Sequence, residues 1–184
     1  MNDIIQKALA ASETSCAVKV YESAELPVSF LVFSGELIKS CETNICGNYN
    51  SSWTCPPASG TMEVQREKIL AYKNAFVFTT KHDLEDSFDY EGMTTGKELH
   101  TVLTLDLKDR LGGNFPVYGA GSCLLCKDEN GKPRCAFPRP CLFPGKKTGS
   151  IEAAGINVTE LSKAAGIVYN NGPNTVTFFS MVLW

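Results

Sequence analysis

Four cysteines stand close together in the second half of the chain, in the pattern Cys-x2-Cys-x8-Cys-x5-Cys. The gap of two residues lets the first two thiolates point from one tight turn toward the same metal ion or cluster. Gly119 and Gly121 permit such a turn, and prolines stiffen the backbone after the last two cysteines. The pattern therefore predicts a site of four thiolates, formed by Cys123, Cys126, Cys135 and Cys141.

Two kinds of metal site use four thiolates, namely a structural zinc site and an iron–sulfur cluster. Zinc sites more typically pair two Cys-x2-Cys turns, and this segment has one. Iron–sulfur proteins use looser spacings, often with a proline near the last ligand, and Pro144 stands shortly after Cys141. The segment is also locally basic, which suits the negative charge that four thiolates leave around either metal group. The spacing favours an iron–sulfur cluster, with zinc as the alternative.

A second set has three cysteines, in the pattern Cys41-x4-Cys46-x8-Cys55. Three thiolates can hold a second cluster with an open iron, or with a fourth ligand that is not a cysteine. Alternatively, Cys16 folds back to complete the set, or Cys46 and Cys55 merely pack as small buried side chains. We expect the three cysteines to bind metal and Cys16, in a strand-like stretch, to pack in the core.

The composition is that of a soluble globular protein, apart from its cysteines. The chain has 184 residues, a net charge of −3, 43% hydrophobic residues, eight cysteines and two histidines. It lacks the basic excess of a nucleic-acid-binding protein, and no segment is long and apolar enough to cross a membrane. The first residues do not resemble a signal peptide. We therefore expect a cytoplasmic protein whose thiols stay reduced, where clustered cysteines bind metal or do redox chemistry.

The elements that must position these cysteines alternate irregularly between helix and strand. They predict one α+β domain over residues 1–184, or a loosely wound α/β domain, with a mixed sheet. Apolar periodicity and caps predict helices over 3–11 and 61–72, a helix opened by a capping box of Thr95 and Glu98 and closed at Gly112, and a helix from Asn157 to Gly166. Strands are expected at 18–21, 28–33, 74–79 and 115–118, with a hairpin of 167–169 and 175–183.

Two long irregular segments, about 41–58 and 119–148, lie between these elements and hold seven of the eight cysteines. Loops of this length usually need something else to order them. A bound metal would supply that order, so both segments are expected to be metal-binding loops.

Several blocks of residues, taken in order, resemble the DUF2284 family of predicted metal-binding proteins. They are Asn48-Tyr49, Trp53-Thr-Cys-Pro-Pro57, Gly119-Ala-Gly-Ser-Cys-Leu-Leu-Cys126, Cys141-Leu-Phe-Pro144 and Ser150-Ile-Glu-Ala-Ala-Gly-Ile156. The resemblance runs from about residue 40 to the C-terminus and implies a metal held by the seven cysteines of the two groups, with [4Fe–4S] as its expected form. It implies no reaction. One departure is that residues 127–133 intervene between Cys126 and Cys135 like an inserted turn, where a ferredoxin-like run would place the third cysteine close to Cys126.

Three functions fit these features. The first is electron transfer or redox sensing by one or two [4Fe–4S] clusters, together with a redox protein partner. The second is an iron–sulfur enzyme that binds substrate at the open iron of the three-cysteine site, and the third is a zinc-stabilised binding module. Nucleotide-binding, zinc-protease and radical SAM motifs are missing from the sequence. His82 and His100 are interpreted as solvated side chains, with a packed position as the alternative for His100.

Overall fold

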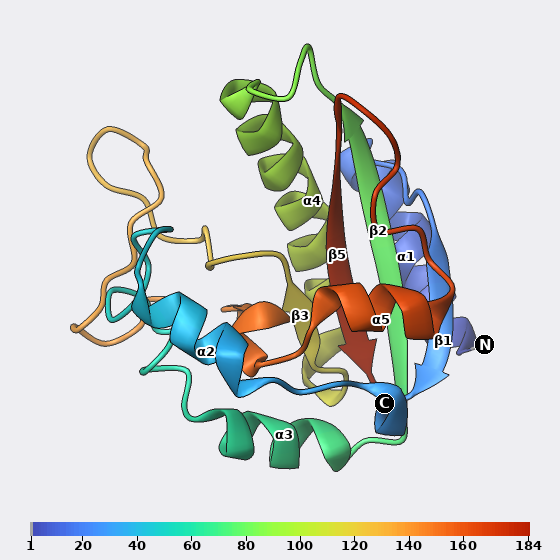
Figure 1. Cartoon of the computed structure of the whole chain (residues 1–184), viewed down its shortest axis with the longest axis horizontal. Coiled ribbons are helices and arrows are strands. Elements are labelled where there is room, and N and C mark those ends of the chain that lie inside the picture. Colours follow the sequence, from blue (N-terminus) through green and yellow to red (C-terminus); the bar gives the residue numbers. More distant parts are fainter. Residues whose placement is uncertain (1) are drawn as a thin grey trace.

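The centre of the fold is one mixed sheet. The computed structural model describes residues 2–184, and within them five strands lie in the order β1-β2-β5-β3-β4 (Figure 1). Neighbouring strands are antiparallel, except that β3 and β4 are parallel. The strands are β1 (Ser23–Pro27), β2 (Asn74–Asp83), β3 (Val117–Gly119), β4 (Gly149–Ser150) and β5 (Thr175–Leu183). With the helices below, this sheet confirms the α+β prediction.

Helices cover both faces of this sheet. The long α4 crosses one face beside α1, whereas α2, α3 and α5 lie on the opposite side (Figure 1). Within residues 2–184 none of the helices is both long and apolar enough to span a bilayer. The helices are α1 (Asp3–Cys16), α2 (Gly35–Glu42), α3 (Met62–Leu70), α4 (Tyr90–Leu111) and α5 (Val158–Ala165), with 3-10 turns η1 (Val28–Phe30), η2 (Gly112–Asn114) and η3 (Glu152–Ala154).

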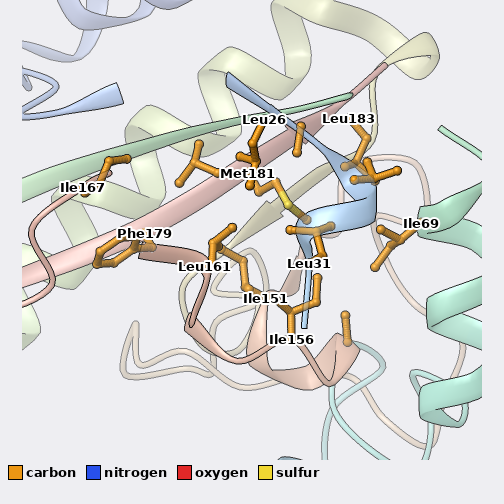
Figure 2. Close-up of a cluster of buried hydrophobic side chains, with 14 residues drawn as sticks. Leu26, Leu31, Ile69, Ile151, Ile156, Leu161, Ile167, Phe179, Met181 and Leu183 are labelled. Atoms are coloured by element: carbon orange, nitrogen blue, oxygen red, sulfur yellow. The ribbon is translucent and has the colours of Figure 1, made fainter. Parts of the chain in front are cut away.

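Two apolar cores form because successive side chains of a strand point to opposite faces. On β2, Phe76 and Phe78 pack against α1 and α4, while Ala75 and Val77 face the other core. That second core is drawn in Figure 2, where Met181 of β5 meets Ile151, Ile156 and Leu161. Because both faces are covered, β2 is buried without interruption from Ala75 to Thr80.

Caps explain which helix boundaries were predicted correctly. Thr61 accepts a hydrogen bond from the Val64 amide at the start of α3, and Asn157 accepts one from the Glu160 amide at the start of α5. The predicted start of α4 was wrong by six residues, because Asp89 rather than Thr95 caps the helix and accepts a hydrogen bond from the Gly92 amide at 2.7 Å. Helix α1 extends beyond the predicted residue 11 to Cys16.

Three strand predictions were also wrong. Residues 18–21 precede β1 instead of forming a strand, and Val28–Phe30 forms a 3-10 turn after Pro27. Residues 167–169 form no hairpin with β5, because β2 and β3 already occupy both edges of that strand. Ile167 is buried in the core all the same. Apolar residues therefore identified buried segments, but not their hydrogen-bond partners.

The prediction that His100 is solvated was wrong, because its side chain is completely buried under β2 and β5. Its Nδ1 is hydrogen-bonded to the Thr80 hydroxyl at 2.9 Å, and its Nε2 to the Ser180 hydroxyl at 2.8 Å. Thr80 also meets Nε2 of His82 at 2.9 Å, so the half-buried His82 joins the same polar network. Burial lowers the pKa of His100 from 6.5 to about 3, and the ring is neutral at physiological pH.

The buried neutral His100 predicts a loss of stability in acid. In the unfolded chain His100 takes up a proton below its ordinary pKa of 6.5, whereas in the folded chain it stays neutral until about pH 3. The free energy of unfolding should therefore fall by about 1.4 kcal/mol per pH unit from this group alone. Urea denaturation of the metal-free protein at several pH values between about 6 and 5 gives the free energy of unfolding at each pH. This free energy should fall less steeply with decreasing pH in His100→Gln than in the wild type. Equal slopes would contradict this prediction.

Candidate metal centre

The two cysteine-rich segments lie side by side at one end of the molecule, where the loop after α2 meets the long loop after β3 (Figure 1). The indole N–H of Trp53 donates to the carbonyl of Arg139 at 2.8 Å. The same ring packs edge-on against Phe137, with centroids 5.0 Å apart. The Cys123 amide donates to the Thr54 hydroxyl at 3.2 Å. The contact between the loops is therefore built mainly by the residues just before Cys55.

The four cysteines of the second group surround one small cavity. All four are partly buried free thiols, and Trp53, Thr54 and Phe143 close the cavity beside them. Gly121 has φ of +69°, which lets the chain turn just ahead of the first of these cysteines. The structure therefore brings together the set that the spacing predicted, Cys123, Cys126, Cys135 and Cys141.

The residues between Cys126 and Cys135 form a small hairpin that projects away from the cavity. Lys127 pairs with Pro133, and the Asp128 carboxylate accepts from the amides of Asn130 and Lys132 at 2.9 and 3.0 Å. The Arg134 amide then donates to the carbonyl of Cys126 at 2.8 Å. The prediction of an inserted turn is confirmed. Because the two ends of the hairpin are hydrogen-bonded to each other, Cys135 lies next to Cys126 in space.

Cys135 lies where its thiolate is stabilised. Burial by itself raises the pKa of this thiol, but hydrogen bonds from the backbone amides of Trp53, Phe137 and Ala136 and from the Ser52 hydroxyl outweigh it. The net effect is a lowered pKa. Donors that converge on one sulfur are what a metal-bound thiolate requires. The donor set thus fits a thiophilic metal ion or an iron–sulfur cluster.

The first group is also gathered, although more loosely. Cys41 lies in the last turn of α2, Cys46 is exposed, and Cys55 is buried. Burial raises the pKa of Cys41 and of Cys55, and the negative charge of Cys46 raises both further. Hydrogen bonds from Ser52 and Thr54 oppose this increase at Cys55. The three thiols are therefore close enough to act on one another electrostatically.

Ser52 acts on both groups, because its hydroxyl is among the causes that lower the pKa of the Cys55 thiol and of the Cys135 thiol. Ser52 and Thr54 are almost completely buried and also contact each other at 3.2 Å. Sequence reasoning missed both residues. Their only signal was the position of two hydroxyl side chains immediately before Cys55 in the Ser-Trp-Thr-Cys run.

Cys16 lies apart from both groups. It is the last residue of α1, not part of a strand, and its thiol donates weakly to the Val102 carbonyl of α4 at 3.9 Å. Burial and the nearby Asp106 carboxylate raise its pKa. It packs partly buried against the α1–α4 core, so the alternative in which Cys16 completes the first group is wrong.

The thiols are gathered but not closed around a single point. Within residues 2–184, no group of three or more His, Cys, Asp or Glu side chains already has the spacing that holds a metal ion. Neither histidine belongs to the cysteine loops. Binding would therefore draw the thiols inward around the cavity, which accords with the dependence of such loops on their metal for order.

The two cysteine-rich loops thus lie together beside an α+β core, and comparison with known families says what this arrangement belongs to. The chain belongs to the DUF2284 family, described as predicted metal-binding protein, whose model matches residues 24–184. No curated protein and no solved structure matches the chain. The family membership establishes metal binding as the expected property and leaves open the metal and its use.

The hydrogen bonds at Cys135 predict an unusual reactivity in the metal-free protein. Since the thiolate is the nucleophile, Cys135 should react with iodoacetamide faster at neutral pH than Cys16, whose pKa is raised. Ser52→Ala should slow Cys135 by roughly three- to tenfold, because it removes one hydrogen bond to the sulfur. Peptide mass spectrometry over a time course measures each site separately.

Ser51→Ala is the matched control, because the exposed Ser51 hydroxyl donates only to the Gly47 carbonyl, at 2.9 Å. It should leave the rate at Cys135 unchanged. If Cys135 and Cys16 of the wild type reacted with iodoacetamide at equal rates, the conclusion that the Cys135 thiolate is stabilised would be refuted.

Proposed function

We propose that this chain is an iron–sulfur protein that holds one or two [4Fe–4S] clusters on its cysteines and uses them to transfer electrons or to sense redox state. The main support is the cavity lined by the four thiols of the second group, together with the donors around Cys135. Hydrogen bonds to cysteine sulfurs are among the features that set a cluster's reduction potential. The cluster would supply one-electron chemistry, and the chain would hold it, orient it and limit its contact with water.

Positively charged side chains lie beside the second group and would stabilise an anionic cluster there. Lys108 of α4 is half-buried close to Cys123, and its ammonium group donates to the carbonyl of Lys147. Burial lowers the pKa of Lys108, and the neighbouring Lys147 lowers it further, whereas the thiolate of Cys123 raises it. Lys147 also lies 6.0 Å from the Trp53 ring centroid, at the edge of the same cavity. These cations offset the charge that four thiolates bring to the site.

The hairpin favours iron–sulfur over zinc. With residues 127–133 folded outward, Cys126 and Cys135 approach like consecutive ligands of a ferredoxin-like run. A zinc site of the common kind would instead pair two Cys-x2-Cys turns, and this chain offers one. Zinc is therefore the alternative that metal analysis must distinguish.

The partial exposure of the cysteines suits exchange of electrons with another protein. The four thiols of the second group are neither fully buried nor fully exposed, so a redox partner could approach closely while the cavity walls shield the metal. Ser52 acts on both cysteine groups, so two clusters would lie near each other. Eight free thiols and no disulfide in the described residues fit a reducing compartment, the cytoplasm.

Metal and sulfide analysis of anaerobically purified protein tests this function. The wild type should be brown, absorb near 400 nm and contain iron and acid-labile sulfide in equal amounts, about four of each per cluster. Cys126→Ala should lose about four of each, because it removes a ligand of the second group. The matched control Cys16→Ala removes a thiol from the α1–α4 core and should keep the full content. Colourless protein with stoichiometric zinc would refute the iron–sulfur proposal.

A separate substitution tests the first group. Cys55→Ser should lower the iron content from about eight to about four atoms per chain and leave the cluster of the second group in place. An unchanged iron content would show that the first group, Cys41, Cys46 and Cys55, holds no iron. The enzyme alternative makes a different prediction: substrate-like ligands would then shift the EPR spectrum of the wild type but not that of Cys55→Ser.

A further inference from the structure

A cleft of about 370 Å³ lies next to the cavity of the second cysteine group. Residues of α3, α4, β3, β4 and η3 surround it, and Trp53, Thr54 and Lys147 line both spaces. Its volume is in the range of sites that bind small molecules. None of the cysteines lines this cleft, so it is a space separate from the candidate metal centre.

The side chains that line the cleft carry positive charge only. Three lysines reach it from different parts of the chain, Lys68 of α3, Lys108 of α4 and Lys147 shortly before β4. Within residues 2–184, no acidic side chain lines the cleft and none of these lysines forms an ion pair. The Cys123 thiolate acts on Lys108 from the cysteine side, whereas Lys68 does not line the cysteine cavity. An anion in the cleft would therefore relieve the repulsion among these cations.

Hydrogen-bond donors and apolar surface complete the cleft. The Lys108 ammonium group gives one of its three donors to the Lys147 carbonyl, which leaves two for a ligand. Burial raises the pKa of Tyr118 to about 12, so its phenol stays protonated and can donate as well. The Trp53 ring and Pro116 add apolar surface, which suits the carbon skeleton of an organic molecule better than a bare inorganic ion.

We propose that this cleft binds a small organic anion with at least two negative charges, carried by phosphate or carboxylate groups. Lysine ammonium groups attract both kinds of anion as point charges. Three such groups, of which Lys108 also acts on the Cys123 thiolate, favour a multivalent anion over a monovalent one. The inference goes beyond the proposed function and does not depend on the metal, since no cysteine lines the cleft. The bound anion would lie beside the second cysteine group, because Trp53 and Lys147 line both spaces.

Isothermal titration calorimetry of the anaerobically purified wild type tests the inference, with glycerol 3-phosphate and tricarballylate as separate probes. In about 0.1 M chloride, which screens loosely attracted ions, at least one probe should bind at a single site with a Kd of about 1 mM or below. Tighter binding of glycerol 3-phosphate would identify a phosphate site, and tighter binding of tricarballylate a carboxylate site. If neither probe bound to the wild type, the inference would be overturned.

Two substitutions on α3 test whether the anion lies in this cleft. Lys68→Gln removes one of the three ammonium groups and should weaken binding roughly three- to tenfold. Lys68 is exposed, so the variant should keep the unfolding temperature of the wild type. Arg66→Gln is the matched control, because Arg66 is exposed on the same helix and loses the same charge but does not line the cleft. It should keep the wild-type Kd. Equal dissociation constants in Lys68→Gln and Arg66→Gln would overturn the inference.

Discussion

The antiparallel pairing of β2 with β5 is the interaction on which the rest of the structure depends. The two strands remain in register from Ala75 opposite Leu183 to Asp83 opposite Thr175. Their alternating side chains supply both apolar cores, and β3 adds to the free edge of β5. The long cysteine loop leaves from the end of β3 and returns at β4, and η3 follows directly. The second cysteine loop is therefore anchored at both ends in the sheet.

A single short segment, Ser52 to Cys55, then organises the centre. The Trp53 ring and the hydroxyls of Ser52 and Thr54 contact the second loop, while Cys55 belongs to the first group. The segment therefore belongs to the surroundings of both cysteine groups at once. This shared segment is a physical reason to consider the seven cysteines as one centre with two parts.

Charge is balanced differently in the two parts. Lys108 and Lys147 lie beside the second group, where backbone and side-chain donors also stabilise the Cys135 thiolate. The first group instead has Glu152 as its charged neighbour, which adds negative charge. A bound cation would relieve the repulsion in the first part, whereas the protein itself supplies much of the compensation in the second. The two parts would accordingly hold metal with different electrostatic support.

The sequence by itself determined the features that depend on local chemistry. Spacing and residue type identified the two cysteine groups and the α+β class, the apolar pattern identified α3, and the Asn157 cap identified the start of α5, because these signals lie within a few residues of one another. Only the tertiary structure decided which residues meet across long separations. The burial of His100, the packing of Cys16 against α4 and the burial of Ser52 beside the second cysteine loop all follow from packing between distant elements. No spacing rule encodes such contacts, since they exist only after the sheet has brought its loops together.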